Sequence, residues 1–192
     1  LGISGDFELQ PDQIPATNPF MVMVLIPLTA FGFYPMLKKM GLNPSPLVRM
    51  TLGMFLAAFS FVAVALIQRV VAGQSELESS ERLHVFWQLI PYFIITSSEV
   101  MVSITGLEFA YTQAPKRMKS VIMGFWLFCV TLGNVIVAQI ARIQSQWERA
   151  QGESIPLEKF FWLFAALMMV AAMAFAVRAR FYKYQDYTQD AD

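Results

Sequence analysis

The chain has 192 residues, of which 56% are hydrophobic and 15% are charged, and its mean hydropathy of +0.50 is too high for an ordinary soluble domain. The formal net charge is zero, which gives no indication of a nucleic-acid partner. With a single cysteine, Cys129, and a single histidine, His84, the composition argues against disulfides, metal sites and a Ser-His-Asp triad, so we expect neither a cofactor nor enzyme activity.

Five apolar segments are candidates to cross a membrane, whose ~30 Å hydrocarbon core takes about 20 residues of helix. The third is the longest and must tilt, bend or project beyond the core. The segments are residues 19–34, 47–71, 86–114, 121–141 and 160–177. The sequence therefore predicts an all-α integral membrane protein whose residues 19–182 form a bundle of five transmembrane helices in the lipid bilayer.

The charges between these segments predict their orientation. The loop before the first span, and those after the second and fourth, together hold five Lys and Arg residues, whereas the other three connections hold nine. Because basic residues concentrate on the cytoplasmic side, we expect the N-terminus outside and the C-terminus inside. Residues 1–18 then form an extracytoplasmic loop, which reads like the middle of a longer protein, and residues 183–192 a cytoplasmic tail.

The first span begins with Asn18 and Pro19 and contains a second proline, Pro27. Asparagine followed by proline is typical of a helix start, where the amide caps the first turn. Pro27 removes a backbone hydrogen bond in mid-helix and predicts a kink.

Glu99 lies close to the middle of the third span. A charged side chain at that depth costs about 2.5–3.5 kcal/mol or more, so it usually faces a polar partner or a water-filled cavity. Ser103 follows four residues later on the same helix face, and Gly106 extends the stripe. We favour a ligand-binding role for Glu99, although a carboxyl group that only fixes helix packing stays open.

Glu108 is nine residues further along, half a turn out of phase with Glu99 if the helix is straight. It also lies nearer the inner end, shortly before Lys116. A packing partner or inner-side ion pair and a role in gating both stay open for Glu108.

The fourth span carries Trp126 near its start, followed by Asn134 and Gln139. A tryptophan at the membrane interface is one interpretation of Trp126. The two amides favour contacts between helices, and the spacing of Ala172 and Ala176 in the fifth span indicates packing or lipid contact.

The stretch EVMVSITGLEFAYTQAPKRMKSVIMGFW resembles the tenth and eleventh helices of the proton-coupled oligopeptide transporters, a branch of the major facilitator superfamily. FELQPDQIPATNPF followed by VLIPL resembles the entry to the eighth helix of that family. The resemblance covers essentially the whole chain and implies helices eight to twelve of a twelve-helix transporter.

The resemblance also implies roles for individual residues. Glu99 matches a glutamate that helps bind the free α-amino group of a peptide, Asn18 an asparagine near the same end, and Trp126 a tryptophan that lines a side-chain pocket. Leu107 and Met123 resemble apolar positions at the inner gate. Pro15 stands where many relatives have a polar residue, so the entry loop differs.

We therefore expect the C-terminal part of a proton-driven symporter that imports di- and tripeptides through a bacterial inner membrane or a plasma membrane. The proton is the coupling ion. The acidic and arginine motif of the first helix of the family is absent, so the chain needs the missing N-terminal helices and is not expected to transport alone. A non-transporting receptor-like or assembly module on the same helices is the alternative.

Overall fold

The computed structural model describes residues 18–41, 45–73, 85–151 and 156–183. Within these ranges five helices are long and apolar enough to cross a membrane. They are Asn18–Lys39, Pro46–Gly73, Leu89–Thr112, Lys119–Ala150 and Leu157–Arg180. All five predicted spans are present, each longer or differently bounded than its apolar segment. Most of the predicted outer loop and inner tail lies outside the described residues.

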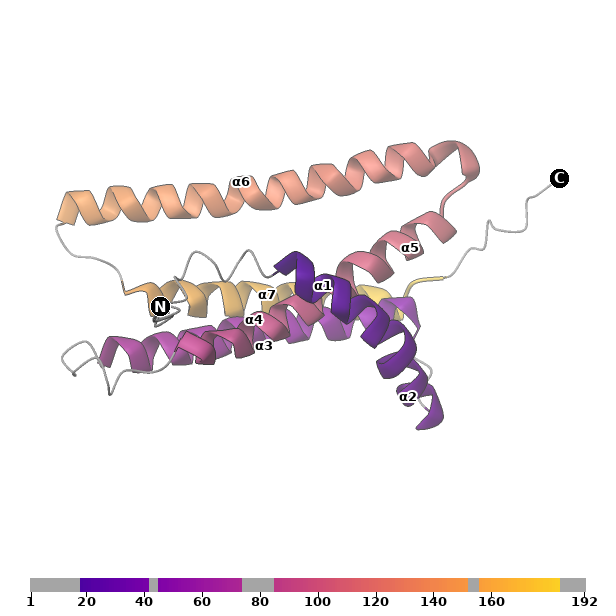
Figure 1. Cartoon of the computed structure of the whole chain (residues 1–192). Helices are drawn as coiled ribbons and strands as arrows, with labels where there is room; N and C mark the ends of the chain where they lie inside the picture. Colours follow the sequence, from indigo (N-terminus) through magenta and orange to yellow (C-terminus); the bar gives the residue numbers. More distant parts are fainter. Residues whose placement is uncertain (1–17, 42–44, 74–84, 152–155, 184–192) are drawn as a thin grey trace, which may run out of the picture.

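The first span is divided into three helical pieces, α1 (Asn18–Pro27), the π-helical turn η3 (Leu28–Phe33) and α2 (Tyr34–Lys39). The irregular turn directly follows Pro27, which has no N–H to donate to the preceding turn. Inside η3, the hydroxyl of Thr29 lies 2.9 Å from the carbonyl oxygens of both Leu25 and Ile26. The predicted disturbance at Pro27 is thus present, and Figure 1 shows α2 pointing away from the other helices.

The third span is also interrupted. A 3₁₀ turn, η4 (Val85–Gln88), leads into α4 (Leu89–Glu99), then the π-turn η5 (Val100–Ile104), then α5 (Thr105–Thr112). The straight helix assumed from the sequence was wrong at η5. A π-turn takes up about one extra residue, so nine residues rotate like about eight, roughly 80° beyond two full turns.

The helix α3 (Pro46–Gly73) is the centre of the bundle and packs on both α4 and α7 (Leu157–Arg180). Both α3 and α7 carry alanines with almost no exposed surface, among them Ala58, Ala65 and Ala172. Small residues let helix backbones approach closely, which is how helices associate in lipid. The packing interpretation of Ala172 agrees with its complete burial.

Two serines and one glycine join α3 to α4. The hydroxyl of Ser60 donates to the carbonyl of Pro91, and that of Ser98 to the carbonyl of Gly53, both at 2.7 Å. A methyl group added to Gly53 would lie 2.7 Å from Cγ2 of Val102 and 3.2 Å from the carbonyl oxygen of Ser98. The two helices therefore cross in close contact at Gly53.

The fourth span, α6 (Lys119–Gln151), is different. Its 33 residues measure about 50 Å at 1.5 Å per residue, well beyond the hydrocarbon core. It continues ten residues past the predicted end because the segment after Ala141 is polar but rich in helix formers, with Gln144 donating to Glu148 at 2.9 Å. Figure 1 shows α6 set apart from the bundle and joined to it through the turn after α5.

The C-terminal ends of the third and fifth spans meet. The rings of Phe109 and Tyr182 are 5.4 Å apart in an edge-to-face arrangement, and the Tyr182 hydroxyl lies 3.3 Å from Oε1 of Gln113. These contacts fix the end of α7 next to the end of α5.

Candidate functional site

Two predicted site residues from distant parts of the chain lie together. Nδ2 of Asn18, the first residue of α1, donates a long hydrogen bond of 3.5 Å to Oε2 of Glu99, the last residue of α4. The hydroxyl of Thr96 lies 3.1 Å from Oδ1 of Asn18 and 2.8 Å from the carbonyl oxygen of Tyr92, so it can donate to either. The carboxylate of Glu99 therefore has a polar partner at mid-span, and it is exposed on the surface of this chain.

Local structure explains this placement. Thr96 is three residues before Glu99 on α4, so both side chains face α1. Thr96 is almost completely buried, at 1% exposure, and its hydroxyl can hold the amide of Asn18 through Oδ1. The amide then presents its N–H group to the open carboxylate. An exposed carboxylate beside an amide can accept hydrogen bonds from an ammonium group.

Ser103 lies in η5 and is half-buried. Four residues in a π-turn rotate by a little less than one full turn, so Ser103 stays near the face of Glu99. Gly106, by contrast, leaves that face and is buried under other side chains. The predicted polar and small stripe thus reaches Ser103 but not Gly106.

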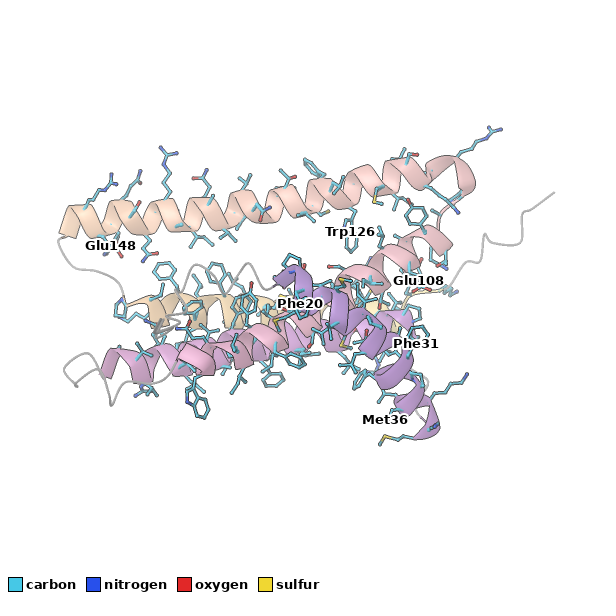
Figure 2. The ribbon with its side chains drawn as sticks, in the orientation of Figure 1. Phe20, Phe31, Met36, Glu108, Trp126 and Glu148 are labelled. Atoms are coloured by element: carbon cyan, nitrogen blue, oxygen red, sulfur yellow. The ribbon has the colours of Figure 1, made fainter. Side chains whose placement is uncertain are left out.

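Trp126 projects from α6 toward α5, as Figure 2 shows. Its ring covers Gly106, where an added methyl group would lie 2.8 Å from Cη2 of Trp126 and 3.0 Å from Cε of Met50. Gly106 is seven residues beyond Glu99, or about 10 Å along the helix, which is the reach of an extended tripeptide. The ring is half-buried against the bundle, in contrast to the exposed residues that follow it on α6.

Glu108 lies elsewhere. It is exposed and, with Lys38 and Arg49, lines a pocket of about 590 Å³ that includes neither Asn18 nor Glu99. Leu107 and Met123, the predicted gate residues, are both half-buried, on α5 and α6. Their role in a gate stays a prediction, as do the ligand-binding roles of the other residues.

Sequence reasoning missed Thr96 and Arg49. Thr96 could have been found, because a threonine three residues from a mid-span glutamate shares its face. Arg49 entered the sequence analysis only as one of the nine basic residues counted for the orientation. Its guanidinium carbon lies 4.2 Å from the centre of the Tyr34 ring, a cation–π contact that depends on the irregular path of the first span.

Five membrane-spanning helices with a carboxylate and an amide paired at mid-span define an integral membrane protein with a polar site on its helical bundle. The chain belongs to the POT family, because the PTR2 profile of that family matches residues 1–163. The resemblance stated from the sequence is thereby confirmed.

The chain is similar to membrane transport proteins of animals, one of which is named as a peptide transporter. It is 46% identical to solute carrier family 15 member 1 of Oryctolagus cuniculus over 105 residues, which cover 53% of this chain and 13% of that protein. It is 40% identical to peptide transporter family 1 of Drosophila melanogaster over 115 residues, covering 60% of this chain and 14% of that protein. The chain thus matches only about a seventh of each of these relatives.

Two solved structures share its fold. An auto-inhibited POT family peptide transporter superposes with a TM-score of 0.80 and 36% identity, covering 96% of this chain and 36% of that one. The POT family transporter PepTSo gives a TM-score of 0.71 and 37% identity, covering 90% of this chain and 34% of that one. The predicted fold class, an all-α set of five spans from a larger transporter, is confirmed.

Proposed function

We propose that this chain forms the C-terminal part of a proton-driven symporter that imports di- and tripeptides by alternating access. The observation that carries the proposal is the hydrogen bond between Asn18 and Glu99. It brings an amide and a carboxylate from two spans to one exposed place at mid-membrane. Such a pair suits the free amino group of a peptide.

The rest of the site supports the same function. Trp126 lies about a tripeptide's length from Glu99 along the helix axis but over another face of the span, so a ligand that contacts both must pass around the span. Ser103 adds a hydroxyl near the Glu99 face. The relatives that the chain resembles include proteins named as peptide transporters.

The chain is proposed to act together with further helices and not to transport alone. It corresponds to about a third of each solved transporter that it matches. The exposed carboxylate of Glu99 then faces helices that complete the cavity, with the N-terminus outside and the C-terminus in the cytoplasm.

The test is competition uptake by the complete transporter in liposomes with an imposed proton gradient. Glu99→Gln keeps the shape of the side chain but removes its charge. Loss of a charged hydrogen bond costs about 1.5–3 kcal/mol, so we expect a loss of at least about tenfold in affinity for dipeptides with a free amino group. Matched N-acetylated dipeptides, which bring no ammonium group, should lose much less.

Glu108→Gln tests the other assignment, in which the second glutamate of the same span binds the ammonium group in place of Glu99. If Glu99→Gln keeps the preference for the free amine in uptake from outside, while Glu108→Gln abolishes that preference, the wrong glutamate has been chosen. Dipeptide uptake that does not depend on the proton gradient would exclude proton coupling. If the unaltered transporter takes up no dipeptide at all, the non-transporting module is favoured.

A further inference from the structure

A pocket with three charged residues among mostly apolar ones lies beside α2 and the start of α3, and neither Asn18 nor Glu99 lines it. Its volume is about 590 Å³, within the range of about 300–1,000 Å³ that is usual for small-molecule sites. Three charged side chains line it, Lys38 from α2, Arg49 from α3 and Glu108 from α5. Three different helices therefore bring two cations and one carboxylate to one hollow.

Part of the wall of this pocket comes from the two π-turns of the described residues. Thr29 and Ala30 belong to η3, and Val100 and Ile104 belong to η5. Single π-turns inside α-helices occur frequently at functional sites. Here two of them, on different spans, border the same space.

The charged groups are placed by this irregular backbone. The extra residue of η5 turns Glu108 to within roughly a quarter turn of Glu99, instead of half a turn away. Tyr34, the first residue after η3, holds its ring 4.2 Å from the guanidinium carbon of Arg49. The ring thus orients one of the two cations that line the pocket.

We propose that this pocket is a second binding site for short zwitterionic peptides, on the inner side of the Asn18–Glu99 site. The carboxylate end of the peptide pairs with Arg49 and Lys38, and its ammonium end with Glu108. This inference rests on the proposed peptide transport, to which it adds a second binding position that the peptide occupies before release.

The two sites are separate. Glu99 and Glu108 are nine residues apart, or about 13 Å along the helix, whereas an extended dipeptide spans about 7 Å. One dipeptide cannot contact both carboxylates. The basic residues of α2 and the start of α3 also mark this end as cytoplasmic, so the second pocket lies toward the inside.

The experiment measures dialanine binding by calorimetry to the complete transporter in phosphatidylcholine nanodiscs. In the Glu99→Gln variant, whose first site is disabled, we expect residual binding. Adding Glu108→Gln or Arg49→Gln should weaken that binding at least about tenfold, because each removes one charged hydrogen bond. Lys39→Gln is the matched control, since Lys39 is exposed beside Lys38 and outside the pocket.

The two ends of the ligand separate peptide binding from a purely gating role. Glu108→Gln should abolish the preference of the residual site for dialanine over N-acetyl-dialanine, and Arg49→Gln its preference over dialanine amide. Arg49→Lys, which keeps the charge, should retain binding, and Lys38→Gln tests the same wall if Arg49 variants do not fold.

Three outcomes would overturn the inference. The first is that Glu99→Gln shows no residual binding, and the second is that neither pocket variant changes the residual binding. The third is that phosphatidylethanolamine displaces dialanine and that the site does not distinguish free from blocked peptide ends. The third outcome would assign the pocket to a lipid headgroup. Normal uptake with a Glu99-dependent amine preference would leave the proposed function standing in each case. Absence of dipeptide uptake by the unaltered transporter would overturn both.

Discussion

The pair α3–α7 and the single helix α6 are built from similarly apolar sequences but pack in opposite ways. In α3 and α7 several alanines are completely buried, and Ala58, Ala65 and Ala172 have no exposed area. In α6, none of the residues in its most apolar window is buried. Hydropathy alone therefore does not tell a packed span from an unpacked one.

The difference lies in side-chain size. Apolar side chains gain little by leaving lipid for protein, so association depends on close backbone approach. The α3–α7 contact provides it with small residues, and the rings of Phe61 and Phe164, 6.0 Å apart, fill the adjacent space. Large exposed side chains surround much of α6, among them Phe125, Phe128 and Ile136. In this chain α6 makes its main contacts near its own start, with α5 and η6 (Lys116–Met118).

The largest effect is expected from adding bulk to the packed pair. Ala58→Leu should destabilise the chain by about 3 kcal/mol, because a buried alanine without free space must push the helices apart. Ala138→Leu, at an exposed position of α6, should change stability by less than about 0.5 kcal/mol. Unfolding of the chain in mixed micelles, followed by circular dichroism, measures both. Equal effects would show that α6 is packed as tightly as α3.

A smaller effect is expected at two matched glycines. Gly53→Ala should cost about 1–3 kcal/mol, since the new methyl group meets Val102 and the backbone of Ser98. Gly133→Ala on α6 has open space around it and should stabilise by up to about 1 kcal/mol through helix propensity.

The same glycine pair sharpens the comparison in the complete transporter. If further helices cover α6 there, Gly133→Ala should lose its benefit or become destabilising, measured by thermal unfolding in detergent. A Gly53→Ala variant as stable as the unaltered chain would contradict the close crossing of α3 and α4.

The smallest effect concerns two hydroxyl groups. Ser98→Ala removes a hydrogen bond between α4 and α3 and should cost about 0.6–1 kcal/mol. The hydroxyl of Thr131 bonds only to the carbonyl of Leu127 in its own helix, so Thr131→Ala should be neutral within about 0.3 kcal/mol. Micelle unfolding of the two variants, compared in one series, decides whether the interhelical bond contributes.

The spans were predictable because length and hydropathy determine whether a helix can cross a membrane. The ends of the helices were less predictable, because a hydropathy profile does not detect the polar helix formers that extend α6 beyond Ala141. The separation of α6 from the bundle was also invisible, because the apolar content of α6 is that of a packed span. Packing depends on the size of facing residues, which a sequence shows only once the contact is known.

The pairing of Asn18 with Glu99 came from the family resemblance and not from spacing, since 81 residues separate the two. The phase of Glu108 was wrong because the prediction assumed a regular helix. Whether a π-turn forms depends on backbone strain and on the neighbouring helices. The valines and the isoleucine of Val100–Ile104 give no sequence signal for it. The path through Pro27 was foreseen, since proline removes a hydrogen bond wherever it stands.

The π-turn η5 lets the third span hold one residue more than a regular helix of the same direction. Deleting one residue between Val100 and Ile104 would place Glu108 eight positions after Glu99 in a regular helix, which gives the same rotation of roughly 80° beyond two full turns. The deletion would therefore keep the direction of α5 and remove only the irregular backbone. Such a variant separates the part that the π-turn itself plays from the part of the carboxylate of Glu108, which a substitution at Glu108 alone does not do.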